Sequence, residues 1–282
     1  MSAASARRPV TPVRVQAILE ERLVDRPDRL VTEEPMEIRL QGAGRPAEAI
    51  AVTMRTPGHD FELAVGLCRT EGLLRGHDDL AEVRYCVADE LGQDQEYNVV
   101  TVATRSPVDL GANRRVVAAG SSCGVCGKAT LDEVAVDCHP VAPGPLVASR
   151  VLTAMPDTLR ASQAVFDVTG GLHAAGLFAP DGALRVVRED VGRHNAVDKI
   201  VGHAVMADLL PLVDSVLVVS GRLSFEIVQK AAVAGIPIVA AVSAPSNLAV
   251  ATAERFEQTL VGFVRDGRGN VYTHPERIDS GR

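Results

Sequence analysis

Apolar and polar positions follow a strand-like pattern in the first part of the chain. Four short segments rich in β-branched residues alternate roughly between apolar and polar positions, which is typical of strands. These segments cover residues 36–40, 49–55, 82–87 and 97–103. One helix is predicted at 60–71, where Leu63, Leu67 and Leu74 recur near helical spacing behind Asp60 as a cap. We therefore expect a small α+β domain at residues 13–113, preceded by a flexible arm at residues 1–12.

The pattern becomes more regular between residue 146 and residue 282. Strands are predicted at 165–168, 174–179 and 184–187, with turns at 170–171 and 180–182 between them. Helices at 193–207 and 225–234 then alternate with apolar strands at 216–219 and 236–242, and a helix capped by Ser246 runs to about Thr259. A β-hairpin that leads into a βαβα array predicts an α/β domain at residues 146–282. The fold class is therefore α/β, or α+β over the whole chain.

A Gly- and Pro-rich loop at residues 114–145 is expected to join the two domains. Glycine and proline occur there at a density that is typical of loops and of domain junctions. Three of the five cysteines lie in this stretch: Cys123, Cys126 and Cys138. We interpret the segment as a reactive loop.

Composition and charge exclude several classes of protein. The chain has 29 Lys and Arg against 36 Asp and Glu, a formal net charge of −7, and it lacks the dense positive charge that non-specific nucleic-acid binding requires. No apolar run reaches the length of a membrane span, and the N-terminus lacks the apolar core of a secretory signal. An odd number of cysteines at low density is atypical of oxidised secreted scaffolds. We expect a cytoplasmic protein with reduced thiols that binds neither nucleic acid nor membrane.

The strongest chemical signal is the segment Ser-Ser-Cys-Gly-Val-Cys-Gly-Lys at residues 121–128. Two cysteines at this spacing can share a metal ion, form a disulfide or pass sulfur between them. Backbone amides and Lys128 would lower the pKa of a thiolate here and make it a nucleophile. A zinc site would need further ligands, for which Cys138 and His139 are an atypical completion. Spacing alone leaves sulfur chemistry, metal binding and incidental cysteines open.

Zinc-dependent deamination is disfavoured. Deaminases pair a Pro-Cys-x-x-Cys segment with an upstream His-x-Glu segment. Here Ser122 precedes the cysteine pair, and His274-Pro-Glu276 lies downstream of it.

Charged and hydroxyl-bearing segments follow several predicted strands. Residues 188–199 join a strand to a helix, and His194 and Asp198 lie four residues apart on one predicted helical face, so the carboxylate could orient the imidazole. The segments 220–224 and 243–247 could offer amides and hydroxyls to an anion, and two arginines around the turn at 265–268 could grip phosphates. Ordinary helix caps and a solvated, salt-bridged helix start are the alternative interpretations. The candidate pocket residues are Arg193, His194, Asp198, Ser220 and Arg222.

Six ordered motifs resemble the FdhD family of formate dehydrogenase accessory sulfurtransferases. Beside the cysteine segment they include Phe-Asp-Val-Thr-Gly-Gly-Leu-His at 166–173 and Glu-Asp-Val-Gly-Arg-His-Asn-Ala-Val-Asp-Lys at 189–199. Similar segments follow at 220–226, 236–246 and 272–277. Together they span roughly the last 160 residues, with fainter similarity from about residue 30.

The resemblance implies a sulfur carrier. Members of that family accept sulfane sulfur from a cysteine desulfurase as a persulfide, and pass it to the Mo-bis(molybdopterin guanine dinucleotide) of formate dehydrogenase. By the same resemblance, the persulfide falls on Cys123, with Cys126 assisting. The family's cofactor-binding segment falls on Phe263, Val264, Arg265, Asp266, Gly267 and Arg268.

The resemblance also implies the architecture and the partners. It implies a homodimer that contacts the formate dehydrogenase catalytic subunit, and a C-terminal domain with a cytidine-deaminase-like fold. No metal ligand and no tightly held cofactor are expected, because the molybdenum cofactor is the acceptor. A cofactor chaperone that moves no sulfur is the alternative, and a zinc-binding hydrolase is a weaker one.

Overall fold

A six-stranded sheet forms the centre of the C-terminal part of the molecule. The computed structural model describes residues 8–86, 97–108 and 139–281. The strand order of this sheet is β13-β12-β11-β10-β8-β9, in which β10, β11 and β12 run parallel and the remaining pairings are antiparallel. The strands are β8 (His173–Phe178), β9 (Leu184–Asp190), β10 (Val216–Val219), β11 (Ile238–Ala241), β12 (Thr259–Arg265) and β13 (Arg268–Thr273).

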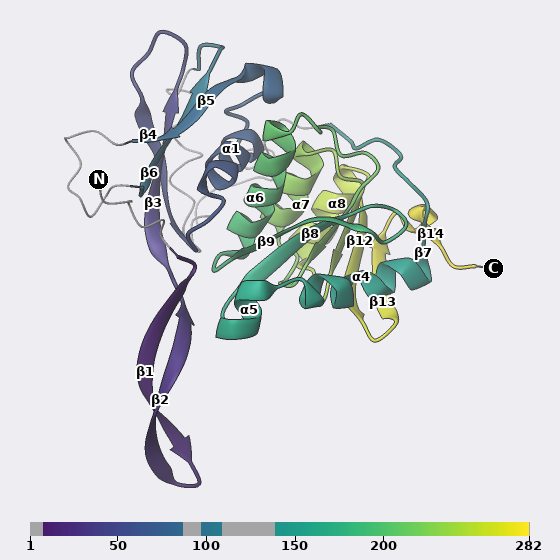
Figure 1. Ribbon diagram of the computed structural model, residues 1–282. Coiled ribbons are helices and arrows are strands. Elements are labelled where there is room, and N and C mark those ends of the chain that lie inside the picture. The colour runs from purple at the N-terminus through teal and green to yellow at the C-terminus, as the bar shows by residue number, and fades with distance from the viewer. Residues whose placement is uncertain (1–7, 87–96, 109–138, 282) are drawn as a thin grey trace.

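Helices cover both faces of this sheet, as Figure 1 shows. The helices α6 (Arg193–Met206), α7 (Phe225–Val233) and α8 (Asn247–Arg255) lie on one face, and α4 (Ser149–Ala161) and α5 (Ala164–Thr169) lie on the other. The strands β10 and β11 are buried throughout, as parallel strands between two helical layers must be. The predicted α/β class and the hairpin followed by a βαβα array are confirmed. The cytidine-deaminase-like assignment stays a prediction.

The N-terminal part is a smaller mixed sheet with one helix. Its strand order is β4-β3-β6-β5, and the only parallel pairing is between β3 and β6. The elements are β3 (Glu34–Gln41), β4 (Glu48–Arg55), α1 (Asp60–Thr70), a 3-10 turn (His77–Asp79), β5 (Leu80–Tyr85) and β6 (Val99–Thr104). All four predicted strands and the predicted helix are present, within two residues of the expected bounds where the chain is described.

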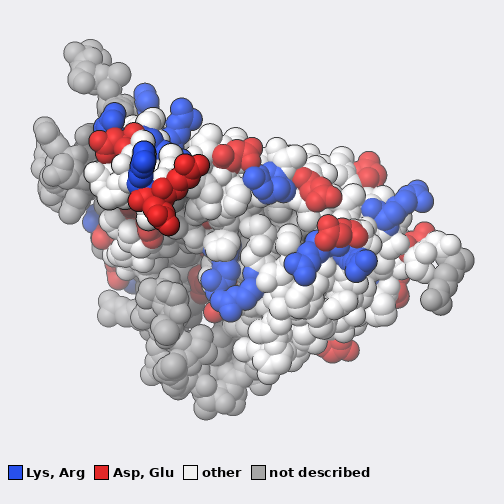
Figure 2. Space-filling view, turned by 90° about the horizontal axis from the view of Figure 1, so that it is seen from below, with Lys and Arg blue, Asp and Glu red and all other residues white. Residues whose placement is uncertain are grey.

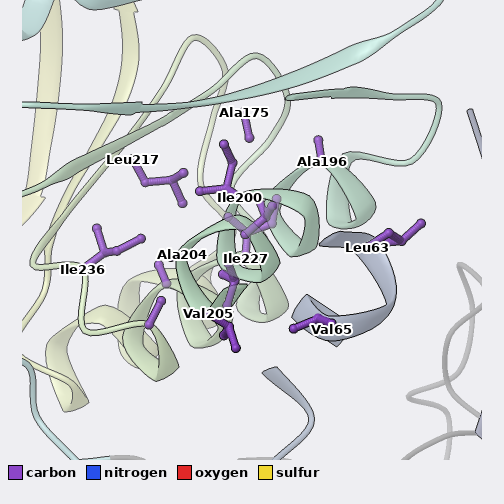
Figure 3. Packing of buried hydrophobic residues seen from close by; sticks show 14 of the residues in the cluster. Leu63, Val65, Ala175, Ala196, Ile200, Ala204, Val205, Leu217, Ile227 and Ile236 are labelled. Atoms are coloured by element: carbon purple, nitrogen blue, oxygen red, sulfur yellow. The ribbon is translucent and has the colours of Figure 1, made fainter. Parts of the chain in front are cut away.

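One hydrophobic core joins the two parts. Helix α1 packs against α6, and Leu63 and Val65 of α1 belong to the same buried cluster as Ile200 of α6 and Leu217 of β10 (Figure 3). A second cluster lies on the opposite face of the six-stranded sheet, between α4 and the same strands. The residues predicted as two domains therefore share side-chain packing.

A long β-hairpin projects from the body of the molecule (Figure 1). Its strands are β1 (Val10–Leu19) and β2 (Arg22–Val31), paired over their whole length. Figure 2 shows side chains of both charges crowded together on this hairpin. The strand β1 begins at Val10, so residues 10–12 of the predicted flexible arm are strand.

Three local predictions are wrong. Asp60 was expected to cap the first helix but is the first residue of α1, and His59 is the N-cap. Residues 165–168 were expected to form a strand but belong to α5, because the Glu189 carboxylate accepts hydrogen bonds from the backbone N–H groups of Val165 (3.0 Å) and Phe166 (2.8 Å) and so caps a helix. The helix capped by Ser246 ends at Arg255, and Thr259 begins β12. The cap itself is confirmed, since Ser246 Oγ accepts a hydrogen bond from the Ala249 N–H at 3.1 Å.

Short segments complete the described chain. The strands β7 (Val147–Ala148) and β14 (Ile278–Asp279) pair in parallel. A 3-10 turn at Pro275–Arg277 directly precedes β14. In the described ranges, no helix combines the length and the apolar character needed to cross a bilayer.

Candidate functional site at the carboxyl edge of the parallel strands

The carboxyl ends of β10, β11 and β12 meet at one edge of the six-stranded sheet. We call this region the carboxyl edge and define it as residues 173, 190–194, 220–224, 243–247 and 263–268. The helices α6, α7 and α8 all begin there, with Gly192, Ser224 and Ser246 as their N-cap residues. Helix N-termini carry partial positive charge and unpaired N–H groups, so the edge favours an anionic ligand.

The loops that follow β10 and β11 are hydrogen-bonded to each other at this edge. The N–H of Leu223 donates to the carbonyl of Ala244 at 3.1 Å, and the N–H of Ser246 donates to the carbonyl of Leu223 at 2.9 Å. The loops after β10 and β11 thus form one surface. Both segments that were predicted to present polar groups to a ligand lie on it.

Three arginines at the carboxyl edge carry charge that no acid neutralises within the described part of the chain. Arg193, Arg222 and Arg265 form no ion pair there, whereas Arg55, Arg185 and Arg188 elsewhere do. The Nε atom of Arg193 is buried without a hydrogen-bond partner. A cation in the first turn of α6 opposes the helix dipole, and a bound anion would relieve that repulsion.

The predicted arginine turn lies between β12 and β13. Asp266 (φ 51°) and Gly267 (φ 70°) are both left-handed, as a two-residue hairpin turn requires. Arg265 and Arg268 are direct cross-strand partners, so their like charges face each other. Phe263 (φ 56°) lies in a bulge of β12 and is exposed, while Val264 is buried in the core. This turn carries two cationic side chains and is suited to binding an anion.

His194 and Asp198 do not pair with each other, which corrects the prediction from their spacing. His194 Nε2 lies 3.1 Å from Ser224 Oγ and 3.6 Å from a Glu226 carboxylate oxygen. The hydrogen bond from His194, supported by Ser224, lowers the pKa of Glu226 to about 2. The Ser224 hydroxyl and the Glu226 carboxylate both lie beside Nε2 of His194. In a catalytic relay the acid would contact one ring nitrogen and the hydroxyl the other, so this arrangement is not such a relay.

Asp198 belongs to a buried network between three helices. It accepts hydrogen bonds from Lys230 Nζ (2.8 Å) on α7 and from Thr70 Oγ1 (2.8 Å) at the end of α1. Asp198 and Lys230 are both buried. Of the five predicted pocket residues, the structure therefore brings Arg193, His194, Ser220 and Arg222 to the carboxyl edge and places Asp198 away from it.

His173 enters the site at the start of β8. Burial lowers its pKa, and the nearby charges of Arg193 and His194 lower it further. A Cβ atom at Gly221 would lie 3.4 Å from His173 Nδ1 and 3.5 Å from Arg193 Cδ, which places the loop after β10 in van der Waals reach of both side chains. The imidazole is therefore neutral near pH 7 and can either donate or accept a hydrogen bond.

A second buried network holds the start of α6 in place. The Asp190 carboxylate, at the end of β9, lies 2.7 Å from Lys199 Nζ and accepts hydrogen bonds from the backbone N–H groups of Thr56 and Gly192. Asn195 also donates to Asp190, at 2.9 Å. Asp190, Asn195 and Lys199 lie in the charged segment 188–199, outside the predicted pocket residues. Their burial shows that they position Arg193 and His194 and are not available to a ligand themselves.

Cys123 and Cys126 lie outside the described residues. The described part of the chain resumes at residue 139. Close to the end of α8, the Val141 N–H donates to the Phe256 carbonyl at 3.0 Å, and Arg277 Nε donates to the Pro143 carbonyl. Cys68, by contrast, is buried in α1, and burial raises the pKa of its thiol. The described part of the chain does not bring three His, Cys, Asp or Glu side chains together in a way that could hold a metal ion.

A family model described as the FdhD/NarQ family matches residues 31–279. The chain belongs to the FdhD/NarQ family. It is 50% identical over 272 residues to a protein named sulfur carrier protein FdhD from Mycolicibacterium paratuberculosis, covering 94% of this chain and 97% of the relative. A Streptomyces coelicolor protein of the same name is 53% identical, with 90% of each chain covered.

A solved structure confirms the fold of this FdhD/NarQ member. The crystal structure of a protein described as a formate dehydrogenase accessory protein from Desulfotalea psychrophila superposes with a TM-score of 0.73 at 24% identity. The match covers 96% of this chain and 99% of that one. The fold is therefore one that is seen experimentally, over nearly the whole length of both chains.

Proposed function

We propose that this FdhD/NarQ member is a sulfur carrier that serves formate dehydrogenase. It accepts sulfane sulfur from a cysteine desulfurase as a persulfide on Cys123 and delivers it to Mo-bis(molybdopterin guanine dinucleotide), the acceptor substrate. The observation that supports this proposal most strongly is the identity of about 50%, over nearly the whole length of both chains, to proteins named sulfur carrier protein FdhD.

The first transfer is a thiol exchange. The Cys123 thiolate attacks the terminal sulfur of the desulfurase persulfide, a new S–S bond forms on Cys123, and the old S–S bond breaks. The desulfurase cysteine leaves as a thiolate, so no external oxidant or reductant is needed. Cys126, three residues further along, assists as the second thiol. In the sequence, Gly120 precedes Cys123, and Gly124 and Gly127 follow it.

The carboxyl edge provides the binding surface for the acceptor in this proposal. A dinucleotide cofactor carries several phosphates, and the edge combines three helix N-termini with arginines that no described acid neutralises. The residues assigned to cofactor binding are Arg193, His194, Ser220, Arg222, and Phe263 to Arg268. We further propose that the protein acts as a homodimer and contacts the formate dehydrogenase catalytic subunit directly.

Intact-protein mass spectrometry after incubation with a cysteine desulfurase and cysteine tests the carrier step. We expect the wild type to gain the mass of one sulfur atom, in a form that dithiothreitol removes. Cys123→Ala should gain none, and Cys86→Ala, which removes a cysteine from the edge of the N-terminal sheet, should behave as the wild type. The Cys126→Ala variant reports whether the second thiol is needed for loading or only for delivery.

Activation of formate dehydrogenase gives the second readout. Cys123→Ala should fold normally and fail to restore activity in cells that lack the carrier. Full activation by this variant would refute the persulfide mechanism. A wild type that binds the cofactor but never gains sulfur would support a chaperone instead.

A further inference from the structure

The projecting hairpin of β1 and β2 has one apolar face (Figure 1). Residues that pair across its two strands lie on the same side of the ribbon, and the side alternates along each strand. We define the apolar face as every second pair, namely Thr11–Leu30, Val13–Asp28, Val15–Arg26 and Ala17–Val24. Apolar side chains dominate it. The opposite face is polar at its centre, where it carries Arg14, Gln16, Asp25 and Arg29.

Side chains of the apolar face are open to solvent. Val24 is 43% exposed and Leu30 is 49% exposed. The hairpin contributes no residue to the buried clusters of the described chain. Its base is held through the opposite face, because Val31 Cγ1 lies only 3.2 Å from where a Cβ atom on Gly171 would be. A two-stranded ribbon is only marginally stable by itself, so we expect a partner to cover the apolar face.

Two charges in the middle of this face restrict what that partner can be. Arg26 and Asp28 form no ion pair with any residue in the described ranges, and Asp28 accepts a hydrogen bond from the backbone N–H of Arg29 at 2.9 Å. A purely apolar partner would leave both charges desolvated, which is costly. The partner must therefore offer an acid to Arg26 and a base to Asp28, between apolar side chains.

The apolar face is its own complement when its order is reversed. From base to tip, the β2 residues of the face are Leu30, Asp28, Arg26 and Val24, which is the order apolar, acidic, basic, apolar. A second copy, related by a two-fold axis that lies between the faces and runs across the strands, presents the reversed order. Acid then meets base, and apolar meets apolar. Residues 10–31 also carry as many arginines as acidic residues, although the net charge of the whole chain is −7.

The outer edges of the hairpin are less suited to a partner than its apolar face. The Thr32 N–H donates to the Pro9 carbonyl at 2.9 Å, which identifies the hydrogen-bonded pairs of the ladder. By that register Pro12 and Pro27 belong to the other pairs, in which N–H positions point outward. Each outer edge therefore lacks a donor, as is usual for strands that are protected against edge pairing. A second copy would stack on the face and would not extend the sheet.

We propose that the apolar face of the hairpin is the interface of the homodimer, with two hairpins stacked antiparallel about a two-fold axis. Arg26 of each copy pairs with Asp28 of the partner subunit, and Val24 packs against Leu30 of the partner subunit. The proposal rests on the proposed function only for the homodimer, to which it adds the surface and the residues. The hairpin residues lie outside the carboxyl edge, so the interface does not depend on how sulfur or cofactor is bound.

Charge reversal with analytical ultracentrifugation tests the interface. The wild type should sediment as a dimer. Arg26→Glu and Asp28→Lys should each raise the dimer dissociation constant at least about 100-fold, because both ion pairs become contacts between like charges. An equimolar mixture of the two variants should recover a dimer, since every contact in the mixed dimer again joins opposite charges. Misfolding cannot explain two variants that dimerise only with each other.

Two control variants change the same kinds of charge on the opposite face. Asp25→Lys and Arg29→Glu lie on the same strand and should leave the dimer intact. Hydrogen exchange gives a second readout. Amides of β1 and β2 should exchange more slowly in the wild type than in Arg26→Glu at equal protein concentration. They should still open more easily than the two large sheets, because no hairpin residue belongs to the buried clusters.

The outcomes separate this inference from the function beneath it. A dimer that survives both Arg26→Glu and Asp28→Lys overturns the interface but leaves the homodimer intact. Monomeric variants that do not recover a dimer when mixed, or controls that also become monomeric, overturn the pairing of Arg26 with Asp28. A monomeric wild type overturns the interface and the homodimer together. Sulfur loading of Cys123 is measured separately by mass, so its failure would refute the carrier and not the interface.

Discussion

At the residue scale, Lys230 and Asp198 form the most deeply buried ion pair described between helices. Burial alone would lower the pKa of Lys230, but Asp198 and Glu71 outweigh it and raise the pKa above its ordinary value. Lys230→Met leaves the Asp198 carboxylate buried without its partner, which should cost about 3–5 kcal/mol of unfolding free energy in urea titrations. The double variant with Asp198→Asn should cost clearly less than the sum of the two single changes. Additive costs would show that the pair is not coupled.

The same residues show what sequence spacing can and cannot give. An i,i+4 relation correctly places His194 and Asp198 on one helix, yet each side chain takes its partner from another element. Asp198 meets Thr70 and Lys230, which lie 128 and 32 residues away in the chain. Charge density predicts a ligand site in the segment 188–199. Which side chains face a ligand and which are buried depends on tertiary contacts that no local pattern contains.

At the element scale, the crossing of α1 and α6 depends on two glycines. A Cβ atom on Gly202 would lie 1.8 Å from the carbonyl oxygen of Glu62, and one on Gly66 would lie 1.8 Å from that of Asp198. Alanine favours helices over glycine by about 1 kcal/mol, so an isolated helix would gain stability from Gly202→Ala. In this fold we expect a loss of about 3 kcal/mol or more, because two backbones must move apart.

Thermal and urea unfolding of Gly202→Ala measure this loss. Gly76→Ala is the matched control, since a Cβ at Gly76 has no heavy atom within 4 Å. A stability equal to or above that of the wild type would mean that the helices do not cross this closely.

Glu62 links the same two elements to β9. Its carboxylate pairs with Arg188 (Nε at 2.5 Å) and lies 3.3 Å from the nearest ring nitrogens of His59 and His203. Burial would raise the pKa of Glu62, but the bonds from Arg188 and His59 outweigh it and lower the pKa to about 2. Because the folded-state pKa is depressed, the contribution to stability is present above about pH 4.5 and is lost as the pH falls toward 2.

Glu62→Gln should remove that pH-dependent contribution. At 1.36 kcal/mol per pKa unit, discounted for partial exposure, we expect the wild type to exceed the variant by about 2 kcal/mol at pH 6. The difference should fall to roughly half by pH 3 and approach zero only below about pH 2, because the folded-state carboxyl is protonated only there. Urea titrations at pH 6, 4.5 and 3 measure it. A difference that does not change with pH would contradict the assignment.

Helices and strands were predictable where periodicity and burial agree. The helix at 193–207 matches α6 (Arg193–Met206), and the apolar run at 216–219 matches β10 (Val216–Val219). Helix α5 was not predictable, because Val165 and Val168 favour a strand and only the distant Glu189 carboxylate caps them as a helix. The projecting β1–β2 hairpin was missed because prolines and charged residues interrupt its alternation.

At the scale of the whole molecule, the shared core decides how the protein unfolds. The sequence predicts separate units at 13–113 and 146–282, and the structure gives each its own sheet. However, α1 buries Leu63, Val65 and Cys68 in the cluster that also contains Ile200 and Ile227. Removing one unit would therefore expose much of the apolar surface of the other, at about 25 cal/mol for each Å². Neither unit should be stable while the other is unfolded.

Native-state hydrogen exchange as a function of urea tests this coupling. We expect amides of β6 (Val99–Thr104) in the smaller sheet and of β10 (Val216–Val219) in the larger sheet to reach the same opening free energy, because both open only by global unfolding. Amides of the β1–β2 hairpin should exchange at much lower urea, since a projecting two-stranded ribbon is marginally stable by itself. The α1 variant Gly66→Ala should lower the opening free energy of both sheets equally. If that change lowered the value for β6 alone, the two sheets would be independent domains, as the sequence predicts, and the packing of α1 on α6 would be a contact between separately folded units.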